Sequence, residues 1–242
     1  MAKRAGSESL VLNVYAQLRS DIFDRRLQPG ERLRPVDLGR QFDVSVGVMR
    51  EALGLLSAQN LVRIERNRGF HVVELSVEAL GDLTEARKIN EGSALRLSIE
   101  RGDIGWESDV LAAHHRMASE PMYPPEDSGT RSVAWAAYHI AFHQTLIAAC
   151  GNSVLLDICT RLSDAAELYR AWSGDGGKAV RDIPGEHKRL MEAAVAHDAD
   201  LAVKLFEQHV DKTKEIVLEL DQESSSTTTT ADGRSRVGRI ER

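Results

Sequence analysis

The sequence predicts a mainly α-helical protein in which an N-terminal winged helix-turn-helix is followed by an all-helical bundle. Two observations predict the first part. Ser45 comes directly before an apolar helical pattern, and residues 62–73 alternate between apolar and polar types around Gly69, as the strands of a hairpin do. The second part is predicted because apolar residues recur with the period of a helix from Ser76 to about residue 222.

The first 75 residues contain the elements of a winged helix-turn-helix in the expected order. A first helix over residues 10–25 is predicted by four apolar residues at intervals of four: Leu10, Val14, Leu18 and Ile22. Pro29-Gly30 then predicts a turn, and a short helix follows. Ser45 can cap the next helix, because its hydroxyl can accept a hydrogen bond from a free amide of the first turn. Residues 61–75 complete the motif as the wing.

The remaining chain divides into a helical domain over residues 76–222 and a tail over residues 223–242. Six helices are predicted in the domain, at residues 77–101, 106–118, 131–150, 153–172, 178–197 and 200–220. A segment of this length can form one hydrophobic core. The tail is rich in Ser and Thr and offers almost nothing to bury, so we expect it to be disordered.

Charge is distributed unevenly between these segments. The whole chain carries a net charge of −6, yet residues 1–75 carry 12 Lys and Arg against 9 Asp and Glu, whereas residues 76–222 carry 15 against 25. A basic first domain joined to an acidic second one favours nucleic-acid binding by the first. No apolar run is long enough to cross a membrane and no signal peptide is recognisable, so we expect a cytoplasmic protein. Cys150 and Cys159 are too few for a disulfide framework.

The second helix of a helix-turn-helix enters the major groove of double-stranded DNA with its N-terminal turn. Arg50, one turn into this helix, can reach a guanine edge or a phosphate. The alternative stays open that the winged helix contacts another protein and that Arg50 only meets solvent. The candidate DNA-binding residues are Arg40, Ser45, Val46, Gly47, Arg50, Arg66, Arg68 and Gly69.

Four histidines are placed as metal ligands would be. His139 and His143 lie four residues apart on one predicted helix, so both rings can point to one place. His187 and His209 lie on the last two helices, which a short turn folds back on each other. Neutral imidazole binds zinc, nickel or cobalt well. The spacing alone favours the alternative, that the four rings are only packed or hydrogen bonded, over a metal site.

The order and spacing of residues 10–75 resemble the DNA-binding domain of GntR-family transcription regulators. The stretches that carry the resemblance are Leu27-Gln28-Pro29-Gly30-Glu31-Arg32-Leu33, Val44-Ser45 with Val48-Met49-Arg50-Glu51-Ala52-Leu53, then Leu61-Val62 and Arg68-Gly69. The chain departs from the family at Val46, where an Arg is usual. An apolar side chain there can touch a thymine methyl instead, so the family's operator sequences do not carry over.

Residues 77–220 resemble the FCD ligand-binding domain of the FadR branch of the same family. The matching stretches are Leu83-Thr84-Glu85-Ala86-Arg87 with Glu91, Phe142-His143 with Gly151-Asn152, and Glu186-His187 with Ala193, Asp198, Ala202 and His209. Many members bind a divalent metal through one Asp and three His. His143, His187 and His209 match the three His, and His139 stands where the Asp is usual. Because an all-His site lacks an anionic ligand, we expect zinc, or else nickel, rather than manganese.

The resemblance also implies a pocket for a small carboxylate above the metal. Its candidate residues are Arg87, Asn152, Tyr169 and Arg170. Arg87 can clamp a carboxylate or form an ion pair with Glu91 at i+4. Asn152 can instead cap the helix that follows it, and Tyr169 and Arg170 can instead belong to the core.

These expectations describe a metabolite-responsive transcription regulator, a homodimer on a pseudo-palindromic operator, with repression as the expected sign. A regulator that senses the metal itself and a metal-dependent hydrolase are the alternatives. The hydrolase would need a general base beside the histidines. Glu186 adjoins His187, but on a helix it should point about 100° away from that residue.

Overall fold

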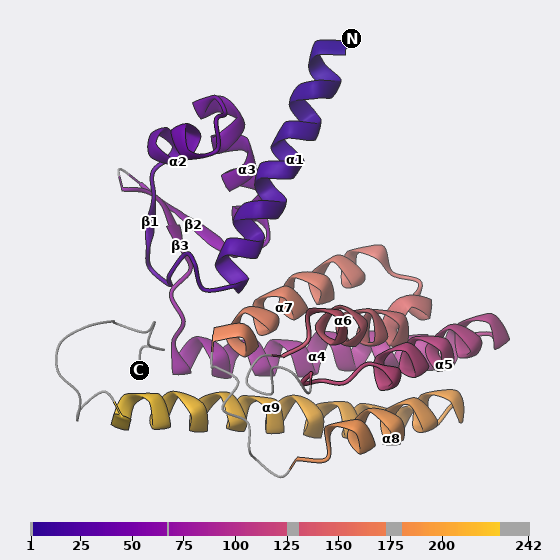
Figure 1. Ribbon diagram of the computed structural model, residues 1–242. Coiled ribbons are helices and arrows are strands. Elements are labelled where there is room, and N and C mark those ends of the chain that lie inside the picture. The colour runs from indigo at the N-terminus through magenta and orange to yellow at the C-terminus, as the bar shows by residue number, and fades with distance from the viewer. Residues whose placement is uncertain (1, 67, 125–130, 173–180, 228–242) are drawn as a thin grey trace.

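The computed structural model describes the backbone of residues 2–66, 68–124, 131–172 and 181–227. Its architecture confirms the predicted mainly helical fold, with a winged helix-turn-helix lying on one side of a helical bundle (Figure 1). We call the elements α1 to β3 the winged-helix unit and the elements α4 to α9 the helical bundle. In the described part of the chain, no helix is both long and apolar enough to span a membrane.

The winged-helix unit consists of three helices and a three-stranded antiparallel sheet. Its elements are α1 (Ala2–Phe23), β1 (Arg32–Leu33), α2 (Pro35–Gln41), α3 (Val46–Ala58), β2 (Val62–Glu65) and β3 (Gly69–Val72). β3 lies between β1 and β2, with Arg32 opposite His71 and Val62 opposite Val72. Gly69 has a φ of +93°, a conformation that favours glycine at the start of β3.

Local sequence signals explain where α3 begins. The Ser45 hydroxyl accepts a hydrogen bond from the Val48 amide at 3.3 Å, as predicted for an N-cap. Gly39 of α2 lies so close to the turn that an added Cβ would come within 3.0 Å of the Val44 carbonyl oxygen. The absence of a side chain at Gly39 therefore allows α2 and α3 to approach, and Met49, Leu53 and other apolar residues of α3 are fully buried.

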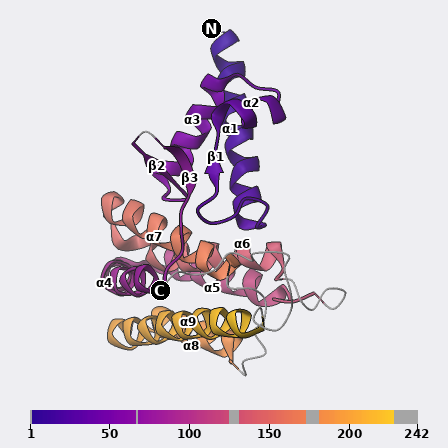
Figure 2. The same ribbon diagram turned by 90° about the vertical axis from the view of Figure 1, so that its left-hand side faces the viewer.

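The helical bundle contains six α-helices and a short 3-10 turn among the described residues. They are α4 (Val77–Arg101), α5 (Ile104–Ser119), α6 (Val133–Ile147), η1 (Ala148–Cys150), α7 (Ser153–Trp172), α8 (Ile183–Val195) and α9 (Ala199–Thr227). α8 and α9 form one layer, and α4 to α7 lie between that layer and the winged-helix unit (Figure 2).

Several helix ends differ from the sequence prediction. α1 begins at Ala2, eight residues before the predicted start, and α6 is shorter at both ends than the predicted helix over residues 131–150. α8 begins at Ile183 rather than at residue 178, because Asp182 caps it by accepting a hydrogen bond from the Gly185 amide at 2.9 Å. α9 continues to Thr227, so the first residues of the tail predicted to be disordered are helical. No Gly or Pro interrupts residues 221–227, and adding residues to an existing helix is much easier than starting one. The rest of that tail lies outside the described residues.

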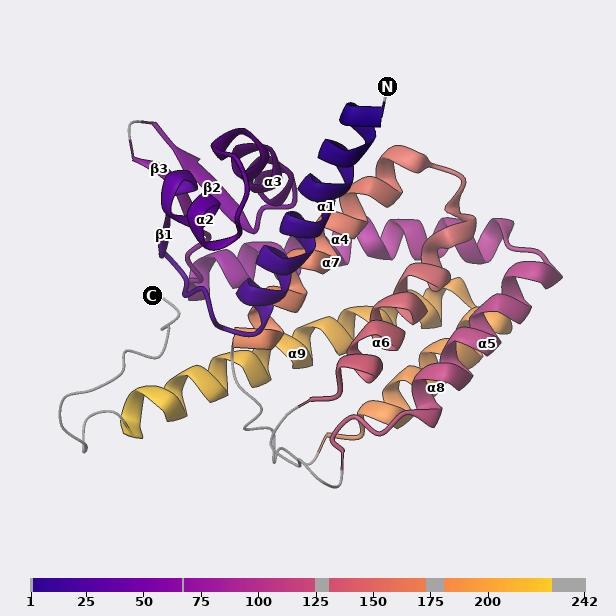
Figure 3. The same ribbon diagram turned by 45° about the horizontal axis from the view of Figure 1, so that its top comes forward.

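The apolar core has two main parts. One fills the bundle and includes Phe142, Leu146 and Leu190. The other fills the winged-helix unit and continues into the bundle, where it includes Leu168 and Tyr169 of α7. α1 crosses over α7 in the view of Figure 3. The two parts of the molecule are therefore joined by a shared apolar contact as well as by the chain.

Candidate functional site

The structure brings the four predicted metal ligands together at the centre of the bundle. α6 supplies His139 and His143, α8 supplies His187, and α9 supplies His209. All four side chains are buried, and one nitrogen from each lies within 4.8 Å of the others. The Nε2 atom of His143 is 3.2 Å from that of His139 and 3.3 Å from that of His187. In a tetrahedral zinc site, two imidazole nitrogens would be about 3.3 Å apart.

Hydrogen bonds at the outer ring nitrogens fix how two of these rings face the centre. The Nδ1 atom of His187 is 2.9 Å from the Ile183 carbonyl oxygen, and that of His209 is 3.1 Å from the Glu186 carboxylate. The Ile183 carbonyl and the Glu186 carboxylate only accept hydrogen bonds. Nδ1 of His209 also lies 3.2 Å from Nη2 of Arg181, but the two hydrogens of that nitrogen have closer acceptors, at 2.6 Å on Glu186 and 3.0 Å on the His209 carbonyl. Each Nδ1 therefore carries a hydrogen, and each Nε2 presents a lone pair to the centre. The Nδ1 atom of His139 is buried without a partner among the described residues.

The arrangement of these ring nitrogens suits a bound cation better than it suits hydrogen bonds among the four rings. The Nε2 atom of His143 faces two other Nε2 atoms, and one hydrogen can serve only one of those contacts. A divalent ion can accept the lone pairs of all four rings at once. When bound, such an ion would supply a positive charge that attracts an anionic ligand.

The buried environment keeps the four imidazoles neutral. Burial lowers the pKa of His139, His143 and His187 well below the usual value, and the neighbouring histidines lower each pKa further. Burial also lowers the pKa of His209, to about 4, although its hydrogen bond to Glu186 opposes the shift. Neutral imidazole is the form that binds metal, so the cluster is ready to do so at pH 7.

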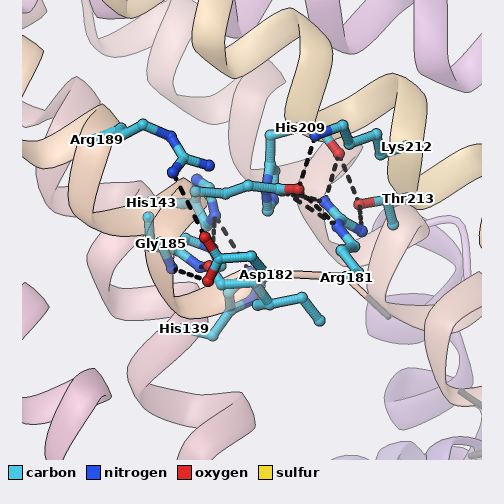
Figure 4. Close-up of polar contacts among 12 residues, drawn as sticks. His139, His143, Arg181, Asp182, Gly185, Arg189, His209, Lys212 and Thr213 are labelled. Carbon is cyan, nitrogen blue, oxygen red and sulfur yellow. Dashed lines mark hydrogen bonds and ion pairs between the residues drawn. The ribbon is translucent and has the colours of Figure 1, made fainter. Parts of the chain in front are cut away.

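Sequence reasoning did not predict that Glu186 contacts the histidine cluster. As expected, Glu186 does not face its neighbour His187. Its carboxylate contacts His209 and Lys212 (3.1 Å) of α9, and Arg181 (2.6 Å), which precedes α8. Figure 4 shows Arg181, Lys212 and Thr213 gathered beside His209. Burial by itself would raise the pKa of Glu186, but hydrogen bonds from His209 and Arg181 hold this pKa below its usual value. The carboxylate therefore remains charged next to His209, a candidate metal ligand.

Three of the four predicted effector residues, Arg87, Tyr169 and Arg170, line one small cavity. The rest of its lining is apolar and polar residues of α4, α7 and α9, which include Val210, the residue after His209, but none of the four histidines. Its volume is about 10 Å³, which is close to the space that one water molecule needs. Asn152 does not line this cavity. Its side-chain oxygen caps α7 by accepting a hydrogen bond from the Leu155 amide at 3.1 Å.

Both arginines of the cavity are held by buried carboxylates. Arg87 makes two hydrogen bonds to Glu91, at 2.7 and 3.0 Å, so the ion pair expected as an alternative is present. Arg170 donates to Glu167 at 2.8 Å, and Glu167 also pairs with Arg131. Burial lowers the pKa of Arg170, although the nearby Glu167 opposes the shift. The guanidinium groups are thus fixed in place at the wall of the cavity.

The candidate DNA-binding residues lie at the surface of α2, α3 and the wing. Arg50 is exposed on α3, and the side chains of Arg40 and Arg68 are both 79% exposed. Their ion pairs, with Asp37 at 3.8 Å and Glu65 at 3.7 Å, are long and exposed, and leave the guanidinium groups accessible. The remaining candidates are Ser45 at the N-cap, exposed Val46, Gly47 and Arg66, and Gly69 at the start of β3.

A winged helix-turn-helix joined to a helical bundle is the architecture of a class of DNA-binding proteins. Comparison with known proteins agrees. Residues 10–72 match the family described as bacterial regulatory proteins, gntR family, and residues 82–212 match the FCD domain. The chain belongs to the GntR family of transcription regulators, with a C-terminal FCD domain.

Relatives along most of the chain are regulators as well. The chain is 33% identical to the HTH-type transcriptional regulator BphR of Paraburkholderia xenovorans (strain LB400), over 88% of this chain and 87% of that protein. It is 34% identical to the HTH-type transcriptional repressor GlaR of Escherichia coli (strain K12), over 82% and 91% respectively. The chain is therefore a DNA-binding transcription regulator and not an enzyme.

Solved structures of low sequence identity share the fold. A GntR transcriptional regulator from Rhodococcus sp. RHA1 superposes with a TM-score of 0.66 at 22% identity, covering 87% of this chain and 98% of that one. E. coli McbR/YncC superposes with a TM-score of 0.68 at 17% identity, covering 87% and 97%.

Proposed function

We propose that this regulator is a homodimeric repressor whose affinity for a pseudo-palindromic operator falls when a small carboxylate binds above a metal ion in the helical bundle. The observation that carries the proposal is that the helical bundle holds both the four-histidine cluster and a cavity lined by Arg87 and Arg170, with His209 of the cluster next in the chain to Val210 of the cavity. Zinc is the expected ion, with nickel as the next choice, because all four ligands are imidazoles.

The charges around the cavity favour an anionic effector. Four neutral histidines leave the charge of a divalent ion uncompensated by its ligands. Glu91 pairs with Arg87, and Glu167 pairs with both Arg131 and Arg170. The bound ion would add a double positive charge that its four ligands do not offset, so a di- or tricarboxylate would match this region better than a monocarboxylate.

We propose repression because of the relatives, and we propose the DNA contacts because of the residues of the winged-helix unit. GlaR is named as a repressor, and an effector that lowers operator affinity would release such a protein from DNA. We assign base or phosphate contacts to Arg50 and phosphate contacts to Arg40, Arg66 and Arg68. Ser45, Val46 and Gly47 would place the start of α3 against the groove, and Gly69 would let the wing approach the DNA backbone.

In the experiment, the zinc-loaded protein first selects the duplexes it binds from a pool of random DNA. The affinity of the protein for this selected DNA is then measured with and without bound metal. Each measurement is made without a carboxylate and with each member of a panel of mono-, di- and tricarboxylates. We expect a polycarboxylate to weaken DNA binding by about 5- to 150-fold, and only when metal is present. Release caused by metal removal or addition alone, with no carboxylate effect, would show instead that the metal is the effector.

Two arginine variants on α7 make this experiment specific. Arg170→Met removes a cavity wall residue, while Glu167 keeps Arg131 as its partner. Arg161→Met is the matched control, because Arg161 is exposed on the same helix. We expect Arg170→Met to keep its metal and lose the carboxylate response, and Arg161→Met to keep both. An unchanged response in Arg170→Met would contradict the assigned cavity.

A further inference from the structure

One tyrosine side chain both lines the effector cavity and holds the junction between the two parts of the molecule. The Tyr169 hydroxyl accepts a hydrogen bond from the Ser76 amide at 3.3 Å and donates one to the Ser76 carbonyl oxygen at 3.2 Å. Ser76 is the N-cap of α4, the first residue of the bundle after the wing. Both backbone polar groups of this junction residue therefore bind a single hydroxyl, on a side chain that is only 5% exposed.

α7 is also the helix against which the winged-helix unit rests. Arg25, just beyond α1, donates two hydrogen bonds to the Ala171 carbonyl oxygen, at 2.9 and 2.6 Å. Arg19 of α1 forms an ion pair with Asp164 at 3.3 Å. Arg19, Arg25 and Ser76 thus bind within the last two or three turns of α7. A small movement of this helix would be transmitted to the winged-helix unit at three points.

The cavity cannot be filled without moving one of its walls. Its volume of about 10 Å³ is too small for any carboxylate, so a bound molecule must displace side chains. Arg87 and Arg170 are each held by a charged hydrogen bond to a buried carboxylate. Tyr169 is held by two neutral hydrogen bonds that are slightly longer than the usual ranges, and these are weaker. Of the three predicted effector residues in the wall, Tyr169 is therefore the one that is displaced most easily.

We propose that Tyr169 couples the effector cavity to DNA binding. Its hydroxyl holds the Ser76 junction in the arrangement that binds the operator, and a molecule that enters the cavity displaces the ring and frees the junction. The displacement of the ring by a bound molecule rests on the function proposed above, but the role of the hydroxyl at the Ser76 junction does not. Removing the hydroxyl should then imitate the effector in a protein that has no effector bound.

The test compares Tyr169→Phe with Tyr138→Phe in the full-length protein as purified, with no carboxylate added. The change in Tyr169 keeps the ring and removes only the hydroxyl, and Tyr138 on α6 is partly exposed and does not line the cavity. Hydrogen exchange is followed by mass spectrometry in peptides that cover residues 73–80. We expect exchange at the junction to be about 5- to 10-fold faster in Tyr169→Phe, the effect of losing one net hydrogen bond, and unchanged in Tyr138→Phe.

A second readout connects the junction to function. The affinity for DNA selected by the wild-type protein should fall about 3- to 10-fold in Tyr169→Phe without any carboxylate, while zinc content and the thermal unfolding midpoint stay close to those of the wild type. Unchanged exchange at residues 73–80 would overturn the assigned hydrogen bonds. Faster exchange with unchanged DNA affinity would overturn the coupling. Neither readout needs an effector, so a wild-type protein that responds to no carboxylate would count against the proposed function alone.

Discussion

Replacing Glu186 by Gln should weaken zinc binding about 10-fold, although Glu186 is not itself a proposed ligand. Its carboxylate lies 3.1 Å from Nδ1 of His209 and keeps the hydrogen on that atom, so that Nε2 can bind metal. Losing such a partner typically costs 10- to 100-fold in metal affinity, by order of magnitude. Here Arg181, at 2.6 Å, and Lys212, at 3.1 Å, already neutralise part of the charge. We therefore expect the lower end of this range, a loss of zinc affinity of about 10-fold, which corresponds to about 1.4 kcal/mol of binding free energy.

The affinity is measured by competition with a chromophoric chelator at pH 7. Glu192→Gln is the matched control, because Glu192 lies on the same helix in an exposed ion pair with Lys188 at 3.8 Å. Its zinc affinity should equal that of the wild type. If Glu186→Gln also bound zinc within about twofold of the wild type, the assigned role of Glu186 in orienting His209 would be wrong.

Three further predictions concern stability, each measured by urea unfolding. First, free His titrates near 6.5 and folded His209 at about 4, so the unfolded chain takes up this proton first as the pH falls. The metal-free protein should lose about 3 kcal/mol through this residue between pH 6.5 and 4, and a flat profile would contradict the buried, neutral cluster. Second, Ser45→Ala removes the cap of α3 and should cost about 1 kcal/mol, whereas no loss would argue against the cap. Third, Arg87→Met leaves Glu91 buried without its partner and should cost about 3–5 kcal/mol, and the double variant Arg87→Met/Glu91→Leu should recover most of that. A double variant as unstable as Arg87→Met would refute this explanation.

Much of the fold could be predicted because its signals are local. The Ser45 cap and the alternation around Gly69 involve residues close in sequence, and α4 and α7 begin and end where their periodicity and flanking residues indicate. Helix ends that depend on competing signals were less predictable. The start of α8 follows the Asp182 cap, and α9 extends past residue 220 because nothing in the next residues stops it.

The candidate site could be predicted only in part, for a related reason. The spacing of His139 and His143 places both rings on one side of α6, but meeting His187 and His209 depends on how α8 and α9 pack. His209, which contacts Glu186, lies 23 residues from it in the sequence, and Ser76 lies 93 residues from its partner Tyr169. No period or motif encodes such contacts. They follow from the orientation of neighbouring helices, which only the folded chain defines.

The metal content of the purified protein tests the central claim most directly. Zinc and nickel are measured by elemental analysis in the wild type, in His143→Ala/His187→Ala and in His114→Ala/His115→Ala. The last variant is the control, because these two histidines lie on α5, outside the cluster. We expect about one ion per chain in the wild type and in the control, and none in the cluster variant. Metal-free wild type that takes up neither ion on addition, or a cluster variant that keeps its metal, would contradict the account.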